Sequence, residues 1–80
     1  SLSTPALSAA DRTLLAAVHL VILGHGSTKN SDSTAPVLAH AARLSAAGLF
    51  RSVRPAFWKV PPLATELLSA PTDGPTVILP

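Results

Sequence analysis

The fold of this chain is decided by Val18-His19-Leu20-Val21-Ile22-Leu23, an apolar run that leads directly into Gly24-His25-Gly26-Ser27. The run is rich in β-branched and aliphatic residues and shows no polar alternation after His19. Such a run is typical of a strand that is buried on both faces, as in a parallel sheet. The glycines on both sides of His25 leave little side-chain bulk around it and let a ligand approach the main chain. The stretch therefore predicts a buried strand with an imidazole at its carboxyl end.

Length and composition limit the chain to one small domain. It has 80 residues, of which 48% are hydrophobic and only 12% are charged. The apolar content is sufficient for a core, but the low charge indicates surface that further sequence or a partner covers. The closing run Thr76-Val77-Ile78-Leu79 has the character of a core strand, so we expect the sequence to be a fragment. We divide it into a lead-in with a short helix (1–17) and a partial domain (18–80).

Several classes of protein are excluded or disfavoured. The chain has no cysteine, which excludes disulfides and thiolate metal sites and fits a reducing compartment. No apolar run approaches the ~20 residues of a membrane span, and the start lacks the features of a signal peptide. The net charge of +2 is too small and too scattered to indicate nucleic-acid binding. We therefore expect a cytoplasmic protein without a membrane or nucleic-acid partner.

The remaining sequence alternates between helical and strand patterns. Ser8 and Asp11 suit a capping box that starts a short helix ending near residue 17. Glycine at position 48 suits the end of a helix that Ser33 or Thr34 caps. The predicted elements after the first strand are a helix (34–47), a strand (52–58), a short helix opened by Pro61-Pro62 and ending near Ser69, and a strand (76–79). This order predicts an α/β fold with a parallel sheet and flanking helices.

That architecture predicts where a ligand binds. In open α/β sheets, ligands bind beyond the carboxyl ends of the strands. His25 follows the first strand, and Lys59 follows the second, next to Trp58. The loop after the first strand also leads to a helix N-terminus, which favours negative groups. Since imidazole is the commonest metal ligand and titrates near neutral pH, this edge suits an anionic ligand together with a metal ion or a proton.

At these residues the chain resembles the CbiX-type sirohydrochlorin chelatases, over roughly residues 18–80. The resemblance rests on Gly24-His25-Gly26-Ser27, Asn30-Ser31-Asp32-Ser33, Ala35-Pro36, a helix closing at Gly48, and Ala56-Phe57-Trp58-Lys59. It implies a flavodoxin-like chelatase half of order β-α-β-α-β that is incomplete at its C-terminus. It also implies an ATP-independent enzyme, a lyase that inserts Co²⁺ or Fe²⁺, and in relatives Ni²⁺, into sirohydrochlorin during cobalamin or siroheme synthesis.

The resemblance also implies roles for individual residues. His25 matches the active-site histidine, which binds the metal and accepts a pyrrole proton, and such a role needs a base that titrates near neutral pH. Gly26, Ser27 and Lys59 are then expected to contact the anionic tetrapyrrole. Family members carry a second metal-binding histidine or a Gly-Tyr-type segment after the third strand, where this chain ends at Pro80. A homodimer, or pairing with a second chelatase half, would complete the site.

Each of these residues also has a purely structural interpretation. His25 can be a loop histidine, and Trp58 and Lys59 can simply end a strand. Ser27 belongs to a residue type that favours turns. We interpret His19, at the opposite end of the first strand, as structural, and His40 as a solvated side chain on its helix.

Three other functions compete with the chelatase. A histidine phosphatase needs an arginine before its histidine, and here Gly24 occupies that position. A serine hydrolase needs the spacing G-x-S-x-G, which the residues around Ser27 lack. The main alternative is a non-catalytic, truncated module that binds a tetrapyrrole or a metal.

Overall fold

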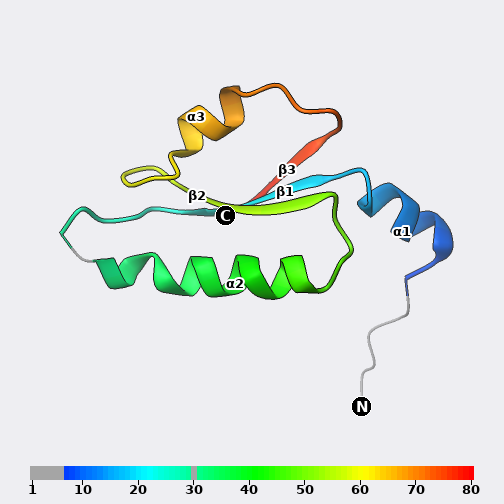
Figure 1. Ribbon diagram of the computed structural model, residues 1–80, viewed down its shortest axis with the longest axis horizontal. Helices are drawn as coiled ribbons and strands as arrows, with labels where there is room; N and C mark the ends of the chain where they lie inside the picture. Colours follow the sequence, from blue (N-terminus) through cyan, green and yellow to red (C-terminus); the bar gives the residue numbers. More distant parts are fainter. Residues whose placement is uncertain (1–6, 30) are drawn as a thin grey trace, which may run out of the picture.

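The computed structural model describes residues 7–29 and 31–80 of the chain. Its sheet is parallel, with the strand order β2-β1-β3. The strands are β1 (His19–Gly24), β2 (Ser52–Phe57) and β3 (Thr76–Leu79), and the helices are α1 (Ala9–Leu15), the 3₁₀ helix η1 (Ser31–Ser33), α2 (Ala35–Ala46) and α3 (Ala64–Ser69). Helix α2 lies on one side of the sheet and α3 on the other (Figure 1). The predicted α/β class with a parallel sheet is therefore confirmed.

The predicted boundaries hold closely, with one exception. The Ser8 hydroxyl accepts a hydrogen bond from the Asp11 N–H at 3.0 Å, so the predicted cap of α1 is confirmed. The lead-in before residue 7 and Asn30 lie outside the described residues. The prediction that Pro61-Pro62 opens the third helix is wrong, because α3 begins at Ala64.

The late start of α3 has a hydrogen-bonding cause. The Phe57 N–H donates to the Pro62 carbonyl at 2.9 Å, and Phe57 forms an isolated parallel bridge with Leu63. Leu63 is consequently extended, with φ −75° and ψ 132°. The chain thus continues strand-like pairing past the prolines before it turns into the helix.

The core consists of two layers that share β1. On the α2 side, Leu20 and Ile22 pack against Ala41. On the α3 side, Val21 packs with Ala56 and Ala64. The strand is therefore buried on both faces, as its unbroken apolar run predicts. None of the described helices has the length and apolar character needed to cross a lipid bilayer.

Strand β3 differs from the prediction in its burial. The apolar character of Thr76–Leu79 indicates a core strand, but all four residues are exposed. Val77, Ile78 and Leu79 keep 48%, 43% and 41% of their surface accessible. Within the described residues, β3 pairs only with β1, and neither hydrophobic layer includes it. The strand forms as predicted, but the described chain leaves it at an open edge of the sheet.

The turn after β1 requires glycine at two positions. A Cβ atom on Gly24 would lie 2.8 Å from Cγ2 of Val37 and 3.1 Å from the Phe57 ring. Gly26 has φ +78°, and its Cβ would lie 2.8 Å from Cγ2 of Val60. Because side chains rarely adopt positive φ and the space around both residues is filled, only glycine fits the turn without a local shift.

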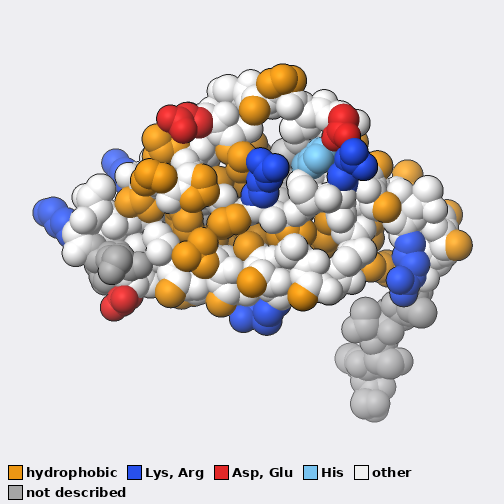
Figure 2. Space-filling model, viewed as in Figure 1, with side chains coloured by type: hydrophobic (Ala, Val, Ile, Leu, Met, Phe, Trp, Pro, Cys, Tyr) orange, Lys and Arg blue, Asp and Glu red, His pale blue; other side chains and the backbone are white. Residues whose placement is uncertain are grey.

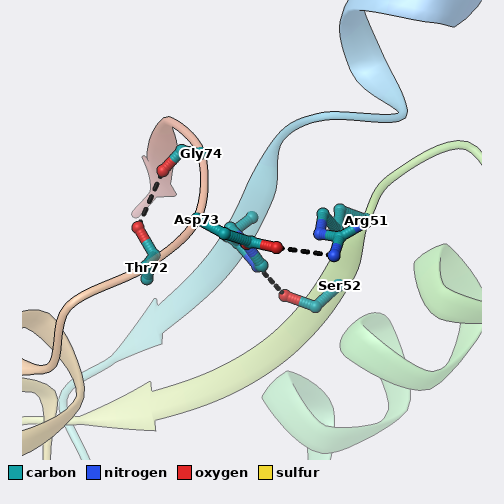
Figure 3. A network of polar contacts seen from close by, with 6 residues as sticks. Arg51, Ser52, Thr72, Asp73 and Gly74 are labelled. Carbon is teal, nitrogen blue, oxygen red and sulfur yellow. Dashed lines mark hydrogen bonds and ion pairs between the residues drawn. The ribbon is translucent and has the colours of Figure 1, made fainter.

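A polar network joins the amino ends of β1 and β2 to the loop before β3. The His19 ring contacts the Ser52 hydroxyl through Nδ1 and the Asp73 carboxylate through Nε2, both at 2.6 Å. The other carboxylate oxygen of Asp73 pairs with Arg51 at 2.5 Å (Figure 3). The hydrogen bonds from Arg51 and then His19 lower the pKa of Asp73 from 3.8 to about 2. The network therefore favours the ionised carboxylate.

This network predicts a loss of stability in acid. A folded-state pKa below the ordinary value means that Asp73 stabilises the fold fully above about pH 4 and loses this effect as the pH falls through about 2. The wild type should unfold at a higher urea concentration than Asp73→Asn above about pH 4, and this difference in urea midpoint should shrink as the pH is lowered to about 2. Glu66→Gln, which removes an exposed carboxylate of α3 that has no described salt bridge, is the matched control. A constant difference between wild type and Asp73→Asn across this range would contradict the assignment.

The glycine turn predicts a second, steric effect. Gly26→Ala should lower the free energy of unfolding by more than the ~1–2 kcal/mol expected for left-handed backbone alone, because its methyl group also meets Val60. Gly48→Ala is the control, since Gly48 has φ +69° but open space around its Cβ position. Urea unfolding gives the loss of stability for each variant. The excess loss in Gly26→Ala over Gly48→Ala measures the collision with Val60, because both variants carry the cost of positive φ. Equal losses would show that the loop absorbs the methyl group.

Candidate functional site

The carboxyl edge of the sheet brings the ends of β1 and β2 together. The two strands run parallel in a register that sets Gly24 opposite Phe57, so His25 and Trp58 both follow at the same edge. The His25 carbonyl accepts hydrogen bonds from the N–H groups of Trp58 at 3.2 Å and Lys59 at 3.0 Å. These main-chain bonds place the predicted site residues His25 and Lys59 side by side.

The imidazole of His25 is open to a ligand. The residue is exposed, and its ring makes no hydrogen bond or ion pair with the described part of the chain. A neutral imidazole in this setting has a free nitrogen lone pair for a metal ion or a proton. The position at the end of a buried strand holds the main chain of His25 firmly while leaving its side chain unengaged.

Gly26 and Ser27 shape the loop that carries His25. Gly26 is buried, with Phe57 and Val60 against the position where a Cβ would lie. The Ser27 hydroxyl accepts a hydrogen bond from the Lys29 N–H at 3.2 Å, and Ser27 is half-buried. Both residues therefore contribute to the turn after β1. Their contact with a ligand stays a prediction.

Trp58 and Lys59 present an apolar ring and a cation beside His25. Trp58 keeps 50% of its surface exposed, which is high for a large aromatic residue, and Lys59 is also exposed. Lys59 forms no salt bridge with any described residue. An exposed indole can stack on a flat conjugated ring, and a free ammonium can pair with a carboxylate.

Helix α2 starts at the same edge. The chain leaves β1, passes through η1, and enters α2 after Thr34, which occupies the N-cap position. Because α2 runs back along the sheet, its N-terminus lies toward the carboxyl ends of the strands (Figure 1). The positive end of the helix dipole therefore favours negative groups here, as the sequence predicts.

The described residues supply few metal ligands at this edge. Within residues 7–29 and 31–80, no group of three His, Asp or Glu side chains is placed to hold a metal ion. His19 lies at the opposite end of β1, where it contacts Ser52 and Asp73. His40 lies on α2 and is half-buried. At the carboxyl edge, His25 is thus the histidine that the fold makes available.

The structure also contains a polar cluster that sequence reasoning does not assemble. The partners of His19 lie 33 and 54 residues further along the chain. No local motif connects them, because the parallel sheet and the loop before β3 bring them together. From the sequence, the position of His19 at the start of a strand indicates only that it lies at the amino end of the sheet, opposite His25.

Comparison with known proteins finds a partial match. A protein of Halobacterium salinarum named probable sirohydrochlorin cobaltochelatase is 38% identical over 61 residues, or 76% of this chain. The chain spans about a fifth of that relative, 21% of its length. No family model matches the chain, and no solved structure matches it significantly. The match supports the resemblance carried by the sequence motifs: over 61 residues, this chain is similar to part of a protein named as a sirohydrochlorin chelatase.

Proposed function

We propose that the carboxyl edge of this chain is the metal- and tetrapyrrole-handling part of a sirohydrochlorin chelatase. The observation that carries the proposal is the pair of main-chain hydrogen bonds that holds Trp58 and Lys59 beside His25. On one edge lie a histidine, an exposed indole, and an ammonium that no described residue pairs with. These groups suit a metal ion, a flat ring and a carboxylate, respectively. The similarity to a protein named as a cobaltochelatase supports this interpretation.

The chemistry follows from the reaction. Insertion forms bonds from the divalent metal to the ring nitrogens of sirohydrochlorin, and two pyrrole N–H protons leave. His25 has one nitrogen lone pair available, which either holds the metal loosely before transfer or accepts a departing proton. Lys59 pairs with a carboxylate of the tetrapyrrole, and Trp58 packs against its ring. Gly26 and Ser27, in the loop that carries His25, contact the tetrapyrrole in this proposal. The proposed reaction uses no ATP.

The metal substrate is proposed from the relative and from the ligand type. Co²⁺ is the first ion to test, because the relative is named as a cobaltochelatase. Imidazole also binds Fe²⁺ and Ni²⁺, so these ions form the comparison series. A single imidazole grips a divalent ion weakly, so we propose that a second copy of the chain or a second chelatase half contributes the other ligands. The alternative function is binding of the tetrapyrrole or metal without catalysis.

The central test follows metal insertion by absorbance. The chain is mixed anaerobically with sirohydrochlorin and Co²⁺, and the rate is compared with the spontaneous reaction. His25→Ala should reduce the acceleration by about 10²-fold, the lower range for loss of a positioned acid or base. His40→Ala, which changes a histidine on α2 away from the edge, should keep it. Absence of acceleration with intact sirohydrochlorin binding would support the non-catalytic alternative, and full activity of His25→Ala would remove the role of that residue.

A second test concerns the tetrapyrrole carboxylates. Lys59→Gln should weaken sirohydrochlorin binding by about two- to fivefold, the range for an exposed ion pair, and the difference should shrink as salt is added. Arg43→Gln on α2 is the matched loss of one positive charge elsewhere. The measurement is an absorbance titration without metal. Equal effects of the two variants would show that net charge, and not Lys59, is responsible.

A further inference from the structure

A recess lies on the α3 face of the sheet, at the end opposite His25. It has a volume of about 370 Å³, within the range of small-molecule sites. Its wall includes the start of β1, residues of β2, the end of α3, and the loop leading to β3. Figure 2 shows this face hollowed between the helix at the top and the sheet, with basic, acidic and histidine side chains around the hollow.

Arg54 gives this recess a cation that pairs with no residue in the described part of the chain. In the parallel register Arg54 lies opposite Val21, which belongs to the layer packed under α3. Arg54 lines the recess, and within the described residues its guanidinium makes no ion pair or hydrogen bond. A guanidinium presents planar donors that match a carboxylate. Arg54, an exposed residue, therefore brings a positive charge to the wall of a space large enough for a ligand.

The acidic residue of the recess is already engaged. Asp73 lines the same space, but its two carboxylate oxygens contact His19 and Arg51. Arg51, which does not line the recess, thus neutralises Asp73, and among the described residues nothing compensates the charge of Arg54.

The rest of the wall is a mixture of apolar groups and hydroxyls. The apolar part comes from Leu20 and Val21 of β1, from Leu67 of α3, and from Ala70 and Pro71 after that helix. Thr76 contributes a hydroxyl that makes no hydrogen bond within the described chain, whereas the Thr72 hydroxyl donates to the Gly74 carbonyl. Thr76 and Arg54 thus offer donors from β3 and β2, on either side of β1.

We infer that this recess is a binding site for a small organic carboxylate with an apolar body, in which Arg54 and Thr76 hold the carboxylate and Leu67, Ala70 and Pro71 cover the aliphatic part. The site is separate from His25 and does not depend on the proposed chelatase activity. It combines a few polar donors with a mostly apolar wall, the composition typical of small-molecule sites.

Hexanoate is the probe that tests this site. Titrated into the isotope-labelled chain and followed by two-dimensional NMR, it should give saturable shifts at the amides of Ser52, Arg54 and Thr76, with His25 unaffected. Arg54→Gln should weaken binding about tenfold, as expected for loss of a charge-assisted hydrogen bond. Arg43→Gln, on the opposite face of the sheet, should bind as the wild type does.

Three comparisons make the result decisive. Hexanamide, which has the same body without the charge, and acetate, which has the charge without the body, should both bind more weakly than hexanoate. Thr76→Val, which keeps the shape of the strand residue, should also weaken hexanoate binding while the spectrum remains that of the folded chain. Non-saturating shifts, equal binding of hexanamide, or unchanged binding by Arg54→Gln would overturn the assignment.

Discussion

The parallel pairing of β1 with β2 on one side and β3 on the other is the constraint on which the whole structure depends. Strand β1 is central: it has a hydrogen-bonded strand on each side and a helix over each face of the sheet. Its side chains therefore divide between two hydrophobic layers. Leu20 and Ile22 belong to the α2 layer and Val21 to the α3 layer. Because one strand supplies both layers, its direction also decides which edge carries His25 and which carries His19.

The fold and the candidate edge are largely predictable because their signals are local in the sequence. An unbroken apolar run indicates a strand buried on both faces, and alternation of strands with helices indicates a parallel sheet. Parallel strands bring their carboxyl ends to one edge, so His25 and Lys59 are expected together from their positions alone. The main-chain bonds between them agree with this reasoning. The chemical role of either side chain is not contained in that pattern.

The features that sequence reasoning misses depend on contacts distant in the chain. The prolines before α3 have the composition of a helix start, but pairing of Phe57 with Leu63 keeps that segment extended. Strand β3 is as apolar as a core strand, and its exposure depends on what packs over it. The network around Asp73 and the recess beside Arg54 arise where the loop before β3 meets two strands. The periodicity of the sequence does not predict these contacts, because they join segments that are far apart in the chain.

The way His25 is held has a consequence for protein engineering. The main chain of His25 is held by its carbonyl group, which accepts hydrogen bonds from the N–H groups of Trp58 and Lys59. The imidazole ring takes no part in these bonds. Gly24 and Gly26 on either side are the positions at which a side chain would collide with its surroundings, whereas the His25 side chain is exposed. The side chain at position 25 can therefore be replaced to change the atom that would bind a metal ion. A cysteine or an aspartate placed there would change the softness of the ligand while the surrounding loop kept its course.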